Sequence, residues 1–109
     1  MKQIKVIIKS YLVSKVIKDL KEHVNFTDVI VSSVGIFGKP GDMKTNIKIY
    51  HEYYGYAKRG KLEFFIADDS LDHVIDIINN SVDTGNPDDG KIFVSSVDEV
   101  LKIQLGKEI

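Results

Sequence analysis

The chain has 109 residues, which fits one globular domain, and 43% of them are hydrophobic while 28% are charged. Its formal net charge of −1 gives no electrostatic reason to expect binding to nucleic acid or to an anionic membrane. The chain contains no cysteine, so disulfides, zinc–thiolate sites and thiol nucleophiles are excluded.

The N-terminal segment, residues 1–9, does not have the pattern of a targeting sequence, because lysines interrupt its apolar residues. No apolar run approaches the roughly 20 residues that a membrane-spanning helix needs. We therefore expect a single domain over residues 1–109 that is cytoplasmic and does not insert into a membrane.

The first half of the chain predicts a strand, a helix and a second strand. Residues 2–9 are rich in β-branched residues and predict a strand, while residues 12–24 have apolar positions at helical spacing and predict an amphipathic helix. Residues 28–36 predict the second strand. The strand over 2–9 is expected to place three apolar residues on one face, Ile4, Val6 and Ile8.

The second half predicts a strand, a helix and a further strand. Residues 60–67 predict the third strand, and residues 68–70 (Asp-Asp-Ser) are of the types that cap helix N-termini. Residues 91–94 predict the fourth strand, and residues 100–105 a short additional one. The second helix is expected to bury an apolar stripe made of Leu71, Val74, Ile75 and Ile78.

The resulting order, βαββαβ, is that of the α+β ferredoxin-like fold, with a long segment over 38–59 between the second and third strands. Helices in this order cover one face of the sheet, so association with other copies is expected to bury the other face. Two registers are open for that uncovered face: Val6, Phe64 and Ile66 in one, or Phe65 in the other.

The segment 38–59 lacks clean periodicity, and a loop of this length in a compact domain is usually functional or disordered. It contains several tyrosines, which supply contact area at a low cost in side-chain entropy. Two interpretations are open, a loop that docks on a partner and a β-hairpin whose tyrosines pack on each other.

Residues 84–91 form a turn rich in Gly, Pro and Asp that leads into the apolar run 92–94. Gly85 and Gly90 have the spacing of a P-loop, but Ile92 stands where that motif needs a hydroxyl group, and a strand follows instead of a helix. The turn can still present backbone N–H groups and Lys91 to an anion.

The order of residues over 84–94 resembles the B-loop of the PII signal-transduction (nitrogen regulatory) family, and the likeness covers nearly the whole chain. Residues 31–38 are similar to the family's strand that ends in Gly-Phe-Gly, and 38–59 lie where the family has its T-loop. The resemblance implies a homotrimer that binds ATP or ADP between subunits, in many members with Mg²⁺ and 2-oxoglutarate. It also implies a regulator, not an enzyme, whose T-loop docks on an ammonium transporter or an enzyme of nitrogen assimilation.

The resemblance further implies which residues bind the nucleotide. Gly38 and Lys39 would lie at the phosphates and Phe65 near the adenine, while Ile30 would face the base from the neighbouring cleft wall. Two residues stand where the family usually has phosphate-binding arginines, Lys102 and Gln104. The B-loop would contribute Asp88, Asp89, Gly90 and Lys91.

Several residues depart from the family's pattern. Pro40 replaces the glutamine that ligates Mg²⁺ beside 2-oxoglutarate, which predicts against 2-oxoglutarate binding in the usual geometry because proline has no polar side chain. Asp88 adds a carboxylate at the phosphates, and Lys102 and Gln104 lack the bidentate fork of arginine. These changes weaken polyphosphate binding and predict a site that selects ADP, AMP or another adenine nucleotide over ATP.

The loop residue Glu52 aligns with a tyrosine that is nucleotidylated in some PII proteins, so we expect no such modification. The residues expected to dock on the partner are Tyr50, Glu52, Tyr53 and Tyr54. The three histidines form no ligand set, and we expect no metal site.

Other functions remain open for this element order. RNA-binding modules and small oligomeric metal-tolerance proteins use it too, although the slightly negative charge argues against RNA. The remaining alternatives are a PII-like adaptor without nucleotide control and a regulator of another transport process such as inorganic carbon uptake.

Overall fold

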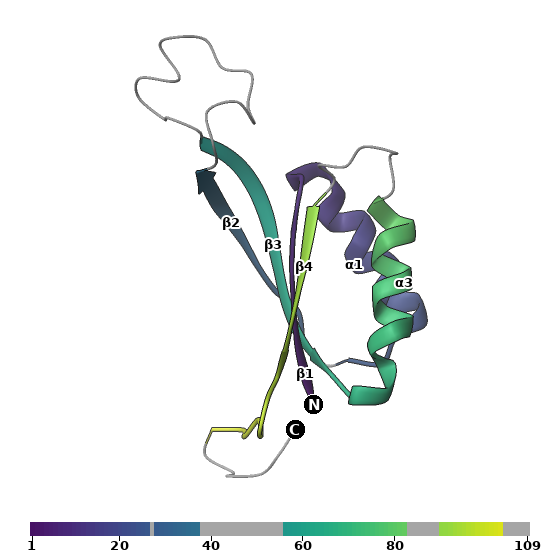
Figure 1. Cartoon of the computed structure of the whole chain (residues 1–109). Helices are drawn as coiled ribbons and strands as arrows, with labels where there is room; N and C mark the ends of the chain where they lie inside the picture. Colours follow the sequence, from purple (N-terminus) through teal and green to yellow (C-terminus); the bar gives the residue numbers. More distant parts are fainter. Residues whose placement is uncertain (27, 38–55, 83–89, 104–109) are drawn as a thin grey trace, which may run out of the picture.

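The computed structural model of the chain describes residues 1–26, 28–37, 56–82 and 90–103. Within these residues, four strands and two helices follow the predicted order βαββαβ, and both helices lie on one side of the sheet (Figure 1). The ferredoxin-like α+β fold is therefore confirmed. The elements are β1 (Lys2–Ile8), the 3-10 turn η1 (Ser10–Leu12), α1 (Val13–His23), β2 (Ile30–Phe37), β3 (Tyr56–Ile66), the 3-10 turn η3 (Asp68–Ser70), α3 (Leu71–Val82) and β4 (Gly90–Ser96).

The strands form one antiparallel sheet in the order β2-β3-β1-β4. The central strand β1 pairs with β3 on one side and with β4 on the other, so that Val6 lies opposite both Leu62 and Ile92. Directly opposed residues of antiparallel strands point to the same face. This register therefore fixes which side chains share each face of the sheet.

The face that the helices cover carries the hydrophobic core. On β1, Ile4, Val6 and Ile8 are buried, which confirms the face predicted for residues 2–9. On β3, Phe64 and Ile66 are buried on this same side of the sheet. The register that would leave Val6, Phe64 and Ile66 uncovered is therefore wrong, and Phe65 belongs to the uncovered face.

Each helix buries one stripe against this core. In α1 the buried residues are Val16 and Leu20, at the predicted helical spacing. In α3, Val74 and Ile78 are buried as predicted, but Ile77 takes the place expected for Ile75, which is only half-buried. The stripe of α3 is thus rotated slightly from the predicted one, because residues 74, 77 and 78 share one helical face.

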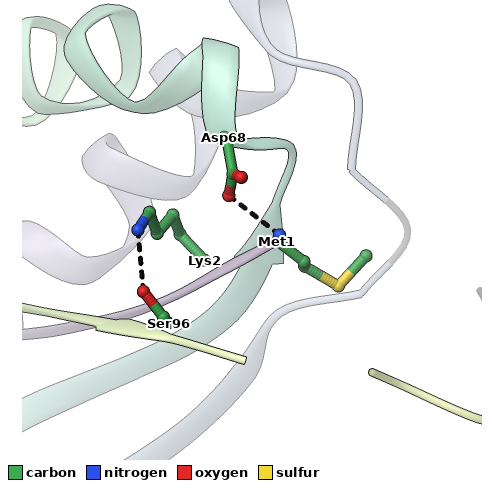
Figure 2. Close-up of polar contacts among 4 residues, drawn as sticks. All are labelled: Met1, Lys2, Asp68 and Ser96. Atoms are coloured by element: carbon green, nitrogen blue, oxygen red, sulfur yellow. Dashed lines mark hydrogen bonds and ion pairs between the residues drawn. The ribbon is translucent and has the colours of Figure 1, made fainter. Parts of the chain in front are cut away.

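The start of the second helical segment differs from the prediction. Residues 68–70 form η3, whose N-cap position is Ala67, and no side chain makes a capping hydrogen bond there. Asp68 instead pairs with the N-terminal ammonium group of Met1 at 2.8 Å, and Lys2 Nζ donates to Ser96 Oγ at 2.8 Å (Figure 2). The hydrogen bond from the ammonium group, followed by its charge, lowers the pKa of the exposed Asp68 carboxyl.

Strands β2 and β3 extend beyond the central strand and form a two-stranded arm. β3 begins at Tyr56, so residues 56–59 of the predicted long segment are strand, and Phe37 pairs with Tyr56. β1 ends at Ile8, opposite Gly60, so these additional pairs have no partner in β1. Figure 1 shows the arm leading away from the two helices.

The remaining strand predictions have two outcomes. β4 begins at Gly90 and ends at Ser96, slightly longer than the predicted 91–94. Of the additional strand predicted over 100–105, the described residues contain only an isolated β-bridge at Leu101, and residues 104 and 105 lie outside the described part.

Candidate functional site

The uncovered face of the sheet, on the side away from α1 and α3, brings together several of the predicted site residues. Phe65 alternates with the buried residues of β3 and therefore points to this face. Ile30 lies opposite Glu63, and Lys91 lies opposite Ile7, positions that alternate with the core residues of β3 and β1. The predicted residues Ile30, Phe65 and Lys91 thus share one face of one sheet.

A cavity of about 330 Å³ lies where β2 begins and β3 ends. Its apolar wall includes Ile30 and Phe65, two residues that the sequence assigned to the base of a nucleotide. Two carboxylates, Asp28 and Glu63, also line it. Its described lining residues include no lysine, arginine or histidine, and the ammonium group of Met1, which also lines it, is already paired with Asp68 at 2.8 Å. This chemistry suits a flat apolar group that carries hydrogen-bond donors, and it does not suit a phosphate.

The opposite end of the same face is basic. Lys61 and Lys91 lie on either side of Ile7, because both are paired with it across the sheet. Arg59 is two residues from Lys61 on β3 and so points to the same face. Lys61 pairs with Glu63 at 2.9 Å, whereas Lys91 is exposed and makes no ion pair with any described residue.

Gly90 is required where β4 begins beside this basic end. A Cβ atom at this position would lie 2.5 Å from the backbone oxygen of Ile7 and 2.9 Å from Ile8 Cγ2. Any larger residue would push β4 away from β1 and displace Lys91. The last two residues of the turn predicted over 84–91, Gly90 and Lys91, belong to strand β4.

The apolar cavity and the basic end are well separated on one chain. Phe65 lies opposite Gln3 and Lys91 lies opposite Ile7, four residues further along β1. Four residues of extended strand span about 13 Å, and β3 and β4 are about 10 Å apart across the sheet. Each chain thus has an apolar surface with hydrogen-bond acceptors at one end of the face and a cationic surface at the other.

A second cavity of about 290 Å³ lies between α3 and β4. Its lining includes Val6 and Ile92, which lie on the face of the sheet covered by the helices, and Ile78 of α3. Because Ile30 and Phe65 lie on the opposite face, the two cavities do not form one site.

Other predicted site residues are located differently. Lys102 follows the bridge residue Leu101 and is exposed. The predicted nucleotide-binding residues that lie outside the described part of the chain are Gly38, Lys39, Asp88, Asp89 and Gln104. The predicted docking residues Tyr50, Glu52, Tyr53 and Tyr54 also lie outside it.

Three polar residues on the uncovered face were not singled out from the sequence: Arg59, Lys61 and Glu63. A signal for them is present, because side chains of a strand alternate between faces. Once Phe65 is assigned to a ligand-binding face, the residues two, four and six positions before it must share that face. The predicted strand began at residue 60, which left Arg59 outside this alternation.

The described ranges also bear on metal binding and on membrane insertion. These residues contain no group of three or more His, Cys, Asp or Glu side chains that could hold a metal ion. Neither α1 nor α3, nor any other helix of the described part, is long and apolar enough to span a membrane.

Comparison with known proteins identifies the family. The sequence profile described as "Nitrogen regulatory protein P-II" matches residues 1–107. The chain is 36% identical over 110 residues to the Nitrogen regulatory protein P-II of Rhizobium meliloti (strain 1021), covering 98% of this chain and 95% of the relative. It is 34% identical to the Nitrogen regulatory protein GlnK of Escherichia coli (strain K12), over 110 residues and the same shares of both chains.

The match extends to a third relative, the Nitrogen regulatory protein P-II of Pasteurella multocida (strain Pm70), at 33% identity over 99% of this chain and 96% of the relative. The sequence likeness therefore extends over almost every residue of the chain. The chain belongs to the nitrogen regulatory protein P-II family of signal-transduction proteins.

Proposed function

We propose that the protein is a trimeric signal transducer that binds adenine nucleotides between subunits and docks on a protein target through residues 38–55. The single observation that carries this proposal is the face shared by Ile30, Phe65 and Lys91, in a chain that matches the P-II family over residues 1–107. A nucleotide has an apolar base at one end and phosphates at the other, as this face has an apolar and a cationic end.

The trimer accounts for the uncovered face of the sheet. Ile30 is 55% exposed there and Phe93 is 48% exposed, and Phe93 lies opposite Lys5 on the central strand. Exposed apolar residues that gather on one face of a sheet indicate an interface. In a ring of three copies, the cavity of one chain can lie next to the basic end of its neighbour, so that one ligand contacts both.

The expected effector is ADP or AMP in preference to ATP. Lys91 supplies a single cation at the phosphates, and Lys102 and Gln104 supply less than two arginines would, because only arginine offers a planar fork to phosphate oxygens. Asp88 adds negative charge beside the phosphates. Pro40 cannot ligate Mg²⁺ through its side chain, so 2-oxoglutarate has no effect in this proposal.

The output of the protein is regulation of a partner and not catalysis. The relatives carry the names of regulatory proteins, and the proposed partner is an ammonium transporter or an enzyme of nitrogen metabolism in the cytoplasm. Binding of nucleotide would shift the equilibrium of the 38–55 segment between docked and free arrangements. The residues proposed to contact the partner in the docked arrangement are Tyr50, Glu52, Tyr53 and Tyr54.

A Lys91→Ala variant tests the site. Loss of the ammonium group should weaken ADP binding about tenfold or more, since a hydrogen bond to a charged group is removed. Lys2→Ala is the matched control, because Lys2 bonds to Ser96 on the covered face and should leave the affinity unchanged. Equal affinity of the Lys91→Ala variant and the wild type would refute the assignment.

Deletion of residues 42–53 tests the docking role. The trimer should persist while binding of the partner is lost, and a partner that still binds would refute it.

The second candidate function is a PII-like adaptor that binds its partner without nucleotide control. The residues Pro40, Asp88, Lys102 and Gln104 favour it. Pro40 and Gln104 each remove a ligand, and Asp88 adds like charge at the phosphates, while Lys102 keeps the charge but lacks the bidentate fork of arginine. Regulation of another transport process, such as inorganic carbon uptake, is compatible with both the nucleotide sensor and the adaptor. Nucleotide titration separates the adaptor from the sensor.

A further inference from the structure

A chain of polar contacts crosses three strands on the uncovered face and ends at Glu63, in the wall of the 330 Å³ cavity. Ser95 Oγ on β4 donates to Gln3 Oε1 on β1 at 3.5 Å. Gln3 Nε2 donates to Glu63 Oε2 on β3 at 3.5 Å. Lys61 Nζ lies 2.9 Å from the other carboxylate oxygen, Glu63 Oε1.

The donor and acceptor of each hydrogen bond in this series follow from the chemistry of the side chains. An ionised carboxylate only accepts hydrogen bonds, so the amide of Gln3 must turn its NH₂ group toward Glu63 and its oxygen toward Ser95. The contact with Lys61 is the shorter one and provides the stronger hold, while Gln3 limits rotation of the carboxylate from the other side. Together they fix Glu63 from two different strands.

The carboxylate of Glu63 keeps capacity for a ligand. It has about four lone-pair positions, and each oxygen has one protein partner, so about two positions remain. The side chain is 19% exposed, and the cavity that it lines also contains Ile30 and Phe65. A ligand seated against these apolar residues would meet a fixed hydrogen-bond acceptor.

The charges around the cavity select the kind of ligand group. Lys61 already compensates the charge of Glu63, so an incoming cation gains little from it. Asp28 adds a second carboxylate to the wall, so a phosphate is repelled. A neutral group with N–H or O–H donors fits both conditions.

We propose that Glu63 reads a neutral hydrogen-bond donor on the nucleotide, either the exocyclic amino group of the base or a ribose hydroxyl, and that Lys61 and Gln3 are positioning residues for it. This inference rests on the proposed nucleotide site and adds the residue that selects the ligand within it. The two donors share one chemistry, and analogues that lack one or the other distinguish them.

The experiment is a calorimetric titration of three ligands into the wild type and variants. The ligands are ADP, inosine diphosphate (an oxygen in place of the amino group) and 2′-deoxy-ADP (no 2′-hydroxyl). The wild type should bind ADP about 10-fold to 100-fold more tightly than the analogue that lacks the donor read by Glu63. Weak binding of inosine diphosphate would identify the amino group, and weak binding of 2′-deoxy-ADP would identify the ribose.

The variants test each residue's role through the ratio of the affinity for ADP to the affinity for the analogue that lacks this donor. Glu63→Leu should reduce the ratio to within about threefold, since it removes both acceptors. Lys61→Met and Gln3→Leu should each reduce the ratio partly. Lys61→Arg should keep the wild-type ratio, because the ion pair with Glu63 is kept. Lys5→Met is the matched control: Lys5 lies directly opposite Glu63 on the same face but makes no ion pair with any described residue, so the ratio should not change.

The outcomes separate this inference from the proposed function. If the wild type binds ADP and both analogues with equal affinity, or if Glu63→Leu keeps the full ratio, Glu63 does not read the ligand, although the nucleotide site stands. If the wild type binds none of the three ligands, the proposed nucleotide site itself is overturned, and this inference with it.

Discussion

Gly60 occupies the point where η1 and the start of α1 pack on β3, at the base of the two-stranded arm. It is buried, and a Cβ atom built at this position would overlap Val13 Cγ2 while lying 3.7 Å from Ser10 Cα. Val13 is β-branched and has little rotamer freedom at the start of a helix, so it cannot turn away at low cost. We therefore predict that Gly60→Ala is destabilising, although alanine usually improves on glycine in a strand.

The magnitude follows from two opposing effects. Forcing one extra carbon into a packed interface costs about 1–3 kcal/mol. Replacing glycine lowers the entropy of the unfolded chain and returns about 0.4–1 kcal/mol. The expected net loss in the free energy of unfolding for Gly60→Ala is therefore about 1–2 kcal/mol.

The assay is urea unfolding followed by circular dichroism, at one fixed protein concentration because association ties stability to concentration. With a urea dependence of about 2 kcal/mol per molar, the midpoint should fall by about 0.5–1 M. The double variant Gly60→Ala/Val13→Ala should be less destabilised than the sum of the two single variants, since Val13→Ala removes the overlapping methyl group. A Gly60→Ala variant as stable as the wild type, or strictly additive variants, would refute the steric explanation.

Three further predictions concern the contacts that join the elements. Ser81 Oγ contacts Asp19 Oδ2 at 2.5 Å and the Ile77 carbonyl oxygen at 2.9 Å, so Ser81→Ala should lower stability by about 1–2 kcal/mol in the same urea assay. This loss should become smaller in an Asp19→Ala background, where only the bond to Ile77 is left to remove, and an unchanged loss would contradict the role of Asp19. The contact with the Met1 ammonium group lowers the pKa of Asp68, so the ionised carboxylate stabilises the fold above the ordinary aspartate pKa, and this stabilisation is lost as the pH falls through the folded-state pKa. Asp68→Asn should therefore make stability depend less on pH below the ordinary aspartate pKa, and an unchanged slope would contradict this. Gly90→Ala places a Cβ 2.5 Å from the Ile7 oxygen and should lower both stability and ADP affinity, whereas normal affinity would show that the start of β4 does not set the site.

The strands and their faces could be predicted where alternation is strict. Residues 3–6 (Gln-Ile-Lys-Val) alternate polar and apolar types, and the structure buries the predicted face around Val6. Residues 56–59 (Tyr-Ala-Lys-Arg) belong to the segment that is predicted as a loop because it lacks clean periodicity, and pairing with β2 makes them strand. In the same way, Asp68 has the character of a helix cap but is bonded to an N-terminal group far from it in sequence.

Part of the candidate site was also predictable. Family resemblance indicated Ile30, Phe65 and Lys91, and the register of the sheet places all three on one face. Glu63 was not found, because its role depends on contacts with Lys61 on its own strand and with Gln3 sixty residues away in sequence. The contact with Gln3 depends on sheet register, which a single sequence does not specify.

The measurement that tests the central proposal most directly is a calorimetric titration of the purified wild-type protein with ATP, ADP and AMP, repeated with Mg²⁺ and 2-oxoglutarate. We predict saturable binding of ADP or AMP with higher affinity than ATP, and no change on adding 2-oxoglutarate. Cooperative binding of ATP and 2-oxoglutarate would contradict the role assigned to Pro40. Absence of binding by all three nucleotides would contradict the sensor itself and leave the adaptor without nucleotide control.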